Sequence, residues 1–525
     1  MAFDLLESGD AGSVALYHGE RDFTRGELAL AGRRAATFLR SLGIRRGDAF
    51  AVWLPDGPVW MQLFFAASQL GALMIPVSTR FRLQEALHVV KTARTSVLIT
   101  PHSFLDFDYA AAAHEIKASV DVLQHVVEVP DFDRFEWSSL EPYPVWDGRE
   151  TDLLCTFMTS GTTGQPKLAA HTAGGIARHA RNVARINDMQ AGNIVLCALP
   201  LYGVLGFVQA IAGLAANASC VLMPVFKADA AAAAIERHGV THFFGPDAMM
   251  DRVLNASSHS LATWRRGAFP EYAGLGQRVI DKAWTAWGVR LAALYGMSEC
   301  FAMAAMRDAN DSVDQRGIPG GTPISSEMAF RIVDPQTDVV LPDRQQGELQ
   351  LRGYNVMAGY LNNPEATAKA FTSDGWFKTG DLAYADGGAF CYVGRIRDSL
   401  RLRGYLVDPA EIETFLARHS GVLGAQVVGV HVEGEGDVAV AFIRHSTTPA
   451  TESELLAYCK EGIAGFKVPR RIVPIDAFPE RDGPNGVKVL RNVLREMASQ
   501  YLGLVPTASE TASASATREI NHEAR

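Results

Sequence analysis

A run of glycine, serine and threonine follows an apolar stretch and ends in a lysine. It reads Thr159-Ser160-Gly161-Thr162-Thr163-Gly164-Gln165-Pro166-Lys167, directly after the apolar residues 152–158. Backbone N–H groups of such a loop can surround phosphate oxygens, and its glycines let the backbone come close. The hydroxyls add hydrogen-bond donors and the lysine adds positive charge. We therefore predict phosphate binding by Thr159, Ser160, Gly161, Thr162, Thr163, Gly164 and Lys167.

The loop differs from the P-loop of kinases and ATPases in the residues around its lysine. A P-loop has glycine directly before the lysine and serine or threonine directly after it, whereas here Pro166 precedes Lys167. Surface loops are also rich in glycine, serine and threonine. The order of the residues and their place after an apolar strand favour a phosphate-binding loop of another kind.

The string resembles the signature loop T-S-G-T-T-G-x-P-K of the adenylate-forming (ANL) superfamily. That superfamily includes acyl-CoA synthetases, adenylation domains of peptide synthetases and firefly luciferase. Further motifs of the family follow in order up to residue 491, and the resemblance covers nearly the whole chain except its tail. On this basis we expect the acyl-CoA synthetase branch of AMP-dependent synthetases and ligases.

The second motif, Tyr295-Gly296-Met297-Ser298-Glu299, resembles the family's Y-G-x-[ST]-E. An aromatic ring can stack on adenine, and a hydroxyl can bond the α-phosphate. A carboxylate suits Mg²⁺, which prefers oxygen ligands. The resemblance implies that Tyr295, Gly296 and Met297 bind the nucleotide, that Ser298 and Glu299 are catalytic, and that Glu299 is the metal ligand.

Two later motifs concern the ribose and a hinge. Thr379-Gly380-Asp381 resembles the family's T-G-D, and the carboxylate of Asp381 would accept hydrogen bonds from the ribose hydroxyls. The run from Gly394 to Asp398 resembles the hinge motif, in which Arg395 would contact the ribose and Asp398 would be the pivot. After the pivot, the resemblance implies that Gly404 lies near the tunnel for the pantetheine arm of CoA.

The catalytic lysine of the family lies near the C-terminus in a pattern like S-G-K-I-x-R. Here Val487 separates Gly486 from Lys488, and Lys488 still lies three residues before Arg491. We assign Lys488 as the catalytic lysine. Its competitor is Lys467, whose segment better resembles a preceding family segment that is mainly structural.

The chain departs from the family pattern around the region that recognises the acid. Gly203 stands where many relatives have histidine or another aromatic residue, residues 271–274 stand where relatives often have G-G-A-P, and Asp247 replaces a common proline. We place Glu271, Tyr272 and Ala273 at the nucleotide. The candidates for the acyl pocket are Tyr202, Gly203, Phe207, Phe244, Asp247, Gly274 and Met303, with an ordinary core role as the alternative for each.

The resemblance implies an ATP-dependent acyl-CoA synthetase that uses ATP, Mg²⁺ and CoA. A carboxylic acid and ATP give acyl-AMP and pyrophosphate, and CoA then takes the acyl group and releases AMP. Because Gly203 leaves room, we expect a bulky hydrophobic or aromatic acid. A carrier protein in place of CoA, a luciferase-like oxygenase, an inactive nucleotide-binding protein and a homodimer stay open.

Composition and charge limit the partners, the location and the cysteine chemistry to be expected of the protein. The 525 residues are 48% hydrophobic and 20% charged with a net charge of −9, which disfavours nucleic acid as the main partner. No signal peptide and no segment able to span a membrane stand out, so we expect a cytoplasmic protein. Six cysteines stand singly, without metal-ligand spacing, which predicts buried, reduced thiols.

The order of apolar runs predicts an α/β fold. Short apolar runs alternate with helical patterns over the first 260 residues, which is typical of parallel strands covered by helices. The strands are expected at 49–54, 72–77, 96–100, 152–158, 193–199, 220–225 and 241–244, and two of the helices at 24–42 and 59–70. A β-rich section begins after about residue 315.

These patterns predict a large N-terminal adenylation domain and a small mobile α+β domain. The large domain, residues 1–394, would hold layered α/β subdomains and the β-rich section. Residues 395–398 would form the hinge, and residues 399–503 the C-terminal domain that carries the catalytic lysine. Residues 504–525 are rich in alanine, serine and threonine and are expected to be disordered.

Overall fold

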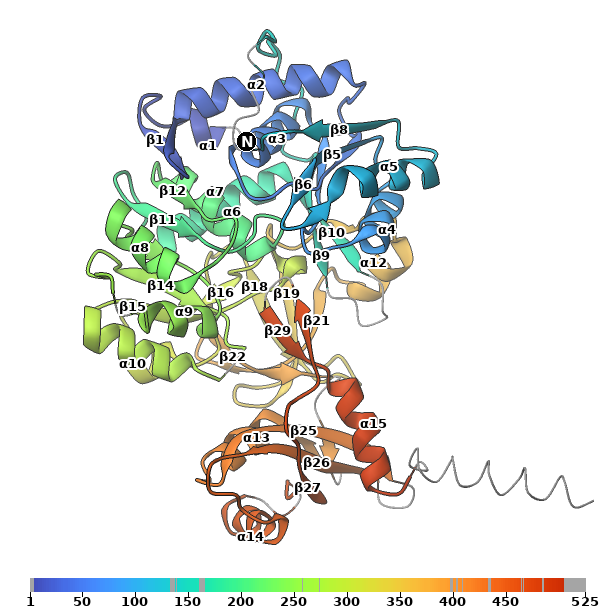
Figure 1. Ribbon diagram of the computed structural model, residues 1–525. Coiled ribbons are helices and arrows are strands. Elements are labelled where there is room, and N and C mark those ends of the chain that lie inside the picture. The colour runs from blue at the N-terminus through green and yellow to red at the C-terminus, as the bar shows by residue number, and fades with distance from the viewer. Residues whose placement is uncertain are drawn as a thin grey trace, which may run out of the picture. The chain divides into compact units, whose positions relative to one another are not determined.

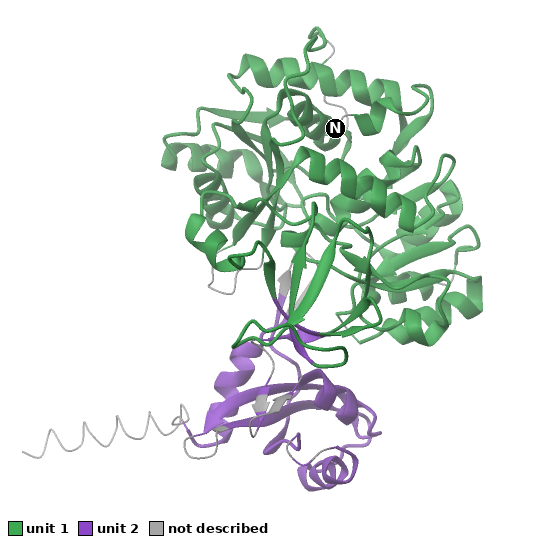
Figure 2. Cartoon of the chain, turned by 180° about the vertical axis from the view of Figure 1, so that it is seen from behind, with its two compact units in different colours: residues 1–345, 349–379, 384–392 green, residues 346–348, 380–383, 393–525 purple. Residues whose placement is uncertain are grey.

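The structure is a computed structural model that describes residues 4–504, apart from 133–136, 138, 160–165, 257, 273, 397–399, 403–404, 408, 433–435, 464, 466 and 484–485. The chain forms two compact units, coloured separately in Figure 2. The first comprises residues 1–345, 349–379 and 384–392, and the second comprises 346–348, 380–383 and the described part of 393–525.

A seven-stranded sheet of the first unit has the order β20-β10-β9-β4-β3-β5-β8. Its strands are β3 (Ala49–Val52), β4 (Leu73–Pro76), β5 (Val97–Pro101), β8 (His125–Val129), β9 (Leu153–Thr159), β10 (Lys167–Thr172) and β20 (Gly359–Tyr360). The pairs among β3, β4, β5 and β8 are parallel, and so is β4 with β9. The chain turns back only at β10, which pairs antiparallel with β9 and with β20.

Helices cover both faces of this sheet (Figure 1). The helices α4 (Leu83–Ala93) and α5 (Tyr109–Ser119) pack on one face, where Val89 and Ile116 meet Leu98 in a continuous apolar cluster. The helix α3 (Pro58–Leu70) is buried along its whole length and lies against α2 (Arg25–Ser41). Proline suits the first turn of α3, and Gly71 ends it with a φ of 69°, a conformation that glycine adopts without strain.

A larger sheet has 13 strands in the order β18-β19-β21-β22-β17-β16-β15-β14-β13-β11-β12-β1-β2. The central strands, which pair with one another in parallel, are β11 (Ile194–Cys197), β12 (Ser219–Leu222), β13 (His242–Phe243), β14 (Arg266–Phe269) and β15 (Arg290–Tyr295). The others are β1 (Val14–His18), β2 (Arg21–Thr24), β16 (Ala305–Met306), β17 (Gly320–Pro323), β18 (Ala329–Val333), β19 (Gly347–Arg352), β21 (Phe377–Asp386) and β22 (Ala389–Arg395). Because β11 and β13–β15 run in one direction, their carboxyl ends meet at one edge of the sheet.

The remaining elements of the first unit connect or cover these sheets. They are α1 (Asp4–Glu7), β6 (Ser103–Phe104), β7 (Phe107–Asp108), α6 (Ala173–Ile186), α7 (Val204–Ala215), α8 (Ala228–His238), α9 (Asp247–Leu254), α10 (Gly276–Trp287), α11 (Val313–Arg316) and α12 (Pro364–Ala370), together with a short 3-10 helix at Ser298–Cys300. No described helix has both the length and the apolar character that a bilayer crossing requires.

The second unit is a small α+β fold. Its sheet contains β23 (Leu400–Leu402), β24 (Tyr405–Val407), β25 (Val422–Val432), β26 (Gly436–His445) and β27 (Arg471–Pro474). The helices α13 (Pro409–Ala417) and α14 (Glu452–Gly462) contribute to one apolar cluster, and α15 (Arg491–Tyr501) contributes to the other. A separate hairpin joins β28 (Glu480–Gly483) to β29 (Gly486–Val489).

The predicted α/β fold is confirmed, with shorter strands than the apolar runs suggested. Each of the seven expected strands is present, but several stop before their run of apolar residues ends; β13, for example, covers only His242–Phe243. The hairpin β1–β2 was not predicted, because its residues include Glu20, Arg21 and Asp22 and form no long apolar run. All six cysteines are buried and unpaired, as expected.

Arg25 joins the first helices to α7 and is almost fully buried, with 1% of its surface exposed. Its guanidinium donates to the carbonyl oxygens of Leu5, Leu214 and Ala218 at 3.0, 3.0 and 3.1 Å. Burial lowers the pKa of Arg25 from its ordinary value. Several backbone carbonyls at the ends of α1 and α7 therefore depend on one side chain.

We expect Arg25→Leu to lower the free energy of unfolding by about 3 kcal/mol, because the three carbonyls would stay buried without donors. Denaturant unfolding followed by tryptophan fluorescence measures the change. The control is Arg33→Leu on the same helix, whose exposed ion pair with Glu7 contributes about 0–1 kcal/mol. Equal losses in both variants would contradict the role assigned to Arg25.

Candidate active site

The ends of the phosphate loop are fixed by the hairpin of β9 and β10. Thr159 closes β9, Lys167 opens β10, and the two residues pair across the antiparallel ladder. Ser160, Gly161, Thr162, Thr163 and Gly164 lie outside the described residues. The Thr159 hydroxyl is buried and has no hydrogen-bond partner among the residues that the structure describes. A buried hydroxyl without a partner suits a ligand oxygen such as that of a phosphate.

Lys167, Tyr360 and Glu299 form a chain from the loop to the second motif. The ammonium of Lys167 lies 4.3 Å from the centre of the Tyr360 ring, a cation–π contact. The hydroxyl of Tyr360 donates to Oε1 of Glu299 at 2.9 Å. One tyrosine thus touches both the loop lysine and the carboxylate that is expected to bind Mg²⁺.

The second motif is held by β9 of the seven-stranded sheet and by the segment that precedes β20. The hydroxyl of Ser298 donates to the carbonyl oxygen of Met158 in β9 at 2.9 Å. The backbone N–H of Met357 donates to the carbonyl oxygen of Glu299 at 2.8 Å. Ser298 and Glu299 therefore sit on a turn whose backbone and side chains are both tied down.

Gly296 is required by a close approach of the chain to itself. A Cβ atom at this position would lie 2.6 Å from backbone atoms of Ala302 and Met303. The turn brings these residues back over the glycine by placing Phe301, Ala302 and Met303 at φ values of 59°, 49° and 34°. Three consecutive left-handed residues that are not glycine store strain, which proteins commonly keep at functional sites.

Two buried histidines support this turn. Nε2 of His171 lies 2.8 Å from the carbonyl oxygen of Ser298, and Nε2 of His179 lies 3.1 Å from that of Ala302. A carbonyl oxygen only accepts, so each Nε2 carries a proton and donates. Burial lowers the pKa of His171 to about 4 and that of His179 to about 3, so both rings are neutral at pH 7.

Tyr295 and Met297 flank the glycine of the motif. Tyr295 ends β15 with 6% of its surface exposed, and its ring meets Phe390 edge-on at 5.2 Å and Tyr392 at 5.7 Å. Met297 packs at the edge of an apolar cluster that contains Met357 and Tyr360. These contacts place both side chains beside the turn where a nucleotide base is expected.

Asp247 has a structural task that explains its departure from the family pattern. Its carboxylate accepts from the backbone N–H groups of Ala248 and Tyr272 through Oδ1 and of Leu275 through Oδ2, at 2.9, 3.2 and 3.0 Å. The side chain is fully buried. Asp247 therefore fixes the segment that contains the expected nucleotide residues Glu271 and Tyr272.

Glu271 lies in the same segment. It accepts from the backbone N–H of Gly276 at 2.9 Å, at the start of α10. Burial raises the pKa of Glu271, the hydrogen bond from Gly276 opposes that shift, and the nearby Asp247 adds to it. Tyr272 is 58% exposed, Gly274 has a φ of 70°, and Ala273 lies outside the described residues.

The acyl-pocket candidates lie in four places: Tyr202, Gly203 and Phe207 directly before or in α7, Phe244 and Asp247 between β13 and the first residue of α9, Gly274 before α10, and Met303 on the turn. Phe207 on α7 packs against Phe64, Phe157 and Phe301 with ring centres 4.8, 5.3 and 6.1 Å away. Tyr202 and Gly203 precede α7, and Phe244 and Met303 are fully buried. Phe207 thus belongs to an aromatic cluster beside the turn, where it contacts Phe301 of the strained segment.

The segment that carries Tyr202 and Gly203 has an anchor that the sequence did not reveal. Asp56, between β3 and α3, accepts from the backbone N–H of Leu201 at 2.9 Å. Burial raises the pKa of Asp56 to about 7, and the hydrogen bond from Leu201 opposes the shift. A carboxyl group that titrates near neutrality therefore positions the start of α7.

The predicted ribose residues lie in the second unit. The guanidinium of Arg395, through Nε, lies 2.9 Å from Oδ1 of Asp381, and the Asp381 carboxylate is 2% exposed. The side chains of Asp381 and Arg395 are therefore in direct contact. Asp398 and Gly404 lie outside the described residues.

The two candidate lysines of the second unit differ in their surroundings. Lys488 lies on β29, where its backbone pairs with Arg481 of β28, and its side chain is outside the described part of the structure. Lys467 forms an ion pair with Glu411. That pair gives Lys467 a structural partner within its own unit, in keeping with the structural role that the sequence suggested for its segment.

The described residues fit Mg²⁺ at Glu299. They contain no group of three or more histidine, cysteine, aspartate or glutamate side chains that could hold a metal alone. Mg²⁺ does not need such a cage, because it usually binds one or two carboxylates together with phosphates and water. The Glu299 carboxylate beside the phosphate loop is a donor of the kind that this mode of binding uses.

Family comparison agrees with the motifs. Residues 8–361 match the model of the AMP-binding enzyme family, and residues 411–482 match that of the AMP-binding enzyme C-terminal domain. The chain is 30% identical over 507 residues to the mitochondrial medium-chain acyl-CoA ligase ACSF2 of Danio rerio, covering 90% of this chain and 83% of that protein. It is 30% identical over 512 residues to 4-coumarate–CoA ligase of Vanilla planifolia, covering 91% and 90%.

The fold agrees as well. ATP-bound MatB from Rhodopseudomonas palustris superimposes with a TM-score of 0.84 at 24% identity, over 94% of this chain and 98% of that one. The chain belongs to the AMP-binding enzyme family, which is the adenylate-forming superfamily that the motifs indicated. Within that family it is an AMP-forming acid–CoA ligase, and it uses ATP, Mg²⁺ and CoA.

Sequence reasoning missed three residues that shape the site: Asp56, His171 and Tyr360. Each contacts a residue far away in the chain; Tyr360, for example, lies 61 positions after Glu299. His171 lies four residues after the phosphate loop, which was the one available signal. Tyr360 lies in the segment that matches the family almost without gaps, but no rule of spacing marks it as a contact of Glu299.

We expect the neutral state of His171 to make stability depend on pH. In the folded protein the pKa of His171 is about 4, below the ordinary value of 6.5. At a pH between these two values the unfolded chain binds a proton that the folded protein does not bind. The stabilisation is complete above pH 6.5 and is lost as the pH falls toward 4, by up to about 3 kcal/mol.

The test is the difference in free energy of unfolding between the wild type and His171→Gln, measured by urea denaturation from pH 7.5 to 4.5. Glutamine keeps a donor for the Ser298 carbonyl but does not titrate. The advantage of the wild type should shrink steadily below pH 6.5. A difference that stays constant over this range would refute the assignment.

Proposed function

We propose that this ligase activates a bulky hydrophobic or aromatic carboxylic acid and passes its acyl group to CoA. The observation that carries the chemistry is the chain of Lys167, Tyr360 and Glu299 beside the Thr159 hydroxyl, which has no hydrogen-bond partner among the described residues. It supplies a cation, a carboxylate for Mg²⁺ and a hydroxyl donor at one place, which is what the transfer of a nucleotidyl group from ATP needs.

In the first step a carboxylate oxygen attacks the α-phosphorus of ATP. The bond from that phosphorus to the bridging oxygen breaks, and pyrophosphate leaves with the electron pair. Bound Mg²⁺ would supply positive charge that stabilises the phosphate oxygens. We propose that Thr159 and Lys167 bind the β- and γ-phosphates, that Ser298 positions the α-phosphate, and that Lys488 adds positive charge during this step.

In the second step the sulfur of CoA attacks the carbonyl carbon of the acyl-AMP. The bond between that carbon and the AMP oxygen breaks, AMP leaves, and the thiol proton passes to solvent. We propose that residues 395–398 are the hinge between an adenylation domain at 1–394 and a C-terminal domain at 399–503. Asp398 would be the pivot, Gly404 would border the pantetheine arm, and Asp381 and Arg395 would hold the ribose.

Two features support a large acid as substrate. Gly203 leaves the start of α7 without a side chain, and the neighbouring Phe207 is part of an aromatic cluster. The two relatives named above act, by their names, on 4-coumarate and on medium-chain acids. Both names give CoA as the acceptor, which favours CoA over the carrier protein that the sequence left open.

A pyrophosphate-release assay tests the proposal. Purified protein receives ATP and Mg²⁺ with aryl, medium-chain, polycyclic and two-carbon acids, each with and without CoA. We expect release that depends on a bulky acid and turns over many times only when CoA is present. Turnover of acetate or propionate alone would overturn the substrate class, and release that CoA does not accelerate would overturn the acceptor.

The same assay separates the two candidate lysines. Lys488→Ala should lower acid-dependent pyrophosphate release by about 100-fold or more, because positive charge at the transferred phosphoryl group is lost. Lys467→Ala should change it by less than about threefold, because its pair with Glu411 is exposed. The reverse pattern would assign the catalytic role to Lys467.

Substitution of Gly203 tests the size of the acyl pocket. The backbone there has φ −95° and ψ 134°, which any residue adopts without strain. Gly203→Phe should lower kcat/KM for aromatic acids by about tenfold or more while acetate changes by less than about twofold. Gly203→Ala should give an intermediate loss. Equal losses for large and small acids would show that the residue does not bound the pocket.

A further inference from the structure

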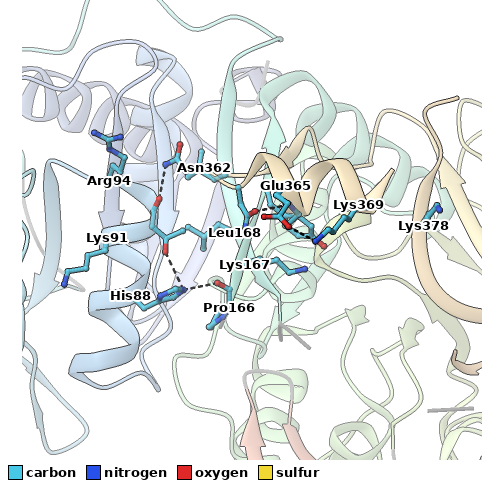
Figure 3. Close-up of a pocket in the computed structure, with 16 residues that line it drawn as sticks. His88, Lys91, Arg94, Pro166, Lys167, Leu168, Asn362, Glu365, Lys369 and Lys378 are labelled. Atoms are coloured by element: carbon cyan, nitrogen blue, oxygen red, sulfur yellow. Dashed lines mark hydrogen bonds and ion pairs between the residues drawn. The ribbon is translucent and has the colours of Figure 1, made fainter. Parts of the chain in front are cut away.

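A cleft of about 840 Å³ opens beside Lys167 in the first unit (Figure 3). Its walls are the C-terminal half of α4, the start of β10, and the segment from Tyr360 through α12. Among the described residues that line it, Glu365 is the one carboxylate and five side chains are cationic: Lys91, Arg94, Lys167, Lys369 and Lys378. This excess of positive charge stands in a protein whose net charge is −9.

The lysines of the cleft are only partly neutralised. Lys369 pairs with Glu365 at 2.6 Å, and Lys378 lies 4.0 Å from Asp338. Within the part of the chain that the structure describes, Lys91 and Arg94 have no carboxylate partner. A concave surface with uncompensated cations raises the local concentration of anions.

Part of this charge has an ordinary structural explanation. Lys91 lies in the last turn of α4 and Arg94 caps it, where the helix dipole favours cations. That explanation does not extend to Lys369 and Lys378, which come from a different part of the chain. In Figure 3, Lys91 and Arg94 rise from α4 on one side, Lys369 and Lys378 lie on the other, and Lys167 stands between them.

The cleft is continuous with the end of the phosphate loop. Lys167 belongs to both, and Nε2 of His88 on α4 lies 3.1 Å from the carbonyl oxygen of Pro166. Because that carbonyl can only accept, His88 donates and fixes the residue before Lys167 to the wall of the cleft. Tyr360, another residue of the lining, contacts Glu299. An anion in the cleft would therefore sit next to the groups that hold the phosphates of ATP.

We propose that this cleft binds inorganic pyrophosphate as it leaves the phosphate loop. The inference rests on the proposed function, which releases pyrophosphate at the loop, and adds a binding site and a route for that product. Pyrophosphate carries several negative charges on a small body, and it matches a cleft whose cations come from two sides. Because the route by which a product leaves is also the route by which it returns, the same cleft would receive pyrophosphate when the reaction runs in reverse.

Direct binding is the first test. Isothermal titration calorimetry with inorganic pyrophosphate, with and without Mg²⁺, compares the wild type with Lys91→Ala, Lys369→Ala and the double variant. We expect the dissociation constant to rise about fivefold for each single variant and about 20-fold for the double variant. The matched control is Lys117→Ala, which removes an exposed lysine from the last turn of α5 and should change nothing. Orthophosphate is the comparison ligand, and it should bind more weakly.

Kinetics identify which phosphate compound uses the cleft. In ATP–pyrophosphate exchange, the double variant should need about 20-fold more pyrophosphate for half-maximal rate while the KM for ATP changes by less than about twofold. The acceptor step is run with CoA and with dephospho-CoA. A raised KM for CoA, with no change for dephospho-CoA or pyrophosphate, would assign the cleft to the 3′-phosphate of CoA and overturn our proposal.

Failure of this inference can be told apart from failure of the proposed function. If no acid supports exchange in the wild type, the proposed function fails, and the calorimetric titration still decides whether the cleft binds pyrophosphate. If exchange occurs but pyrophosphate binds equally well to the wild type, the double variant and Lys117→Ala, the function stands and the cleft has no part in product release.

Discussion

The hydrogen bond from the Ser298 hydroxyl to the Met158 carbonyl links the seven-stranded sheet to the 13-stranded sheet. Met158 lies in the seven-stranded sheet, and Ser298 follows the last parallel strand of the larger one. His171 of the seven-stranded sheet donates to the Ser298 carbonyl, and the backbone N–H of Met357 donates to the carbonyl of Glu299. We call these contacts between the two sheets the seam. The phosphate loop and the acidic motif are far apart in the chain, so this seam, together with the contacts of Tyr360 with Lys167 and Glu299, sets the distance between them.

Burial explains why the seam is polar and still stable. The side chains that cross it pair with backbone carbonyls, and burial keeps the two histidines neutral, so no isolated charge is placed in the core. Asp56 and Asp247 also fix backbone segments, but they accept hydrogen bonds where the histidines donate them. Each accepts from the backbone N–H of a segment at the expected substrate pocket. The segments around Gly203 and residues 271–274, which depart from the family pattern, are thus each held by a buried carboxylate.

Local sequence patterns predicted the elements and the motifs, because each depends on residues close together in the chain. The strand before the phosphate loop follows from an apolar run, and the burial of the cysteines follows from their single placement without metal-ligand spacing. Gly296 was identified by its motif, but its reason is a contact with Ala302 and Met303, which depends on the left-handed backbone of Phe301. The bonds of Asp56 to Leu201 and of Tyr360 to Glu299 cross 145 and 61 positions, and no periodicity reports such pairs. The inclusion of residues 346–348 and 380–383 in the second unit is likewise a property of packing.

The buried cysteines have a consequence for measuring the distance between the two units. All six thiols are shielded and unpaired, and burial raises the pKa of Cys155 well above its usual range and that of Cys459 to about 11. Alkylating dyes react with exposed thiolates, so the native thiols are poor targets. One cysteine introduced on the exposed surface of each unit would therefore accept a fluorophore pair selectively, and the energy transfer between the dyes would report their separation in real time as ATP, acid and CoA are added.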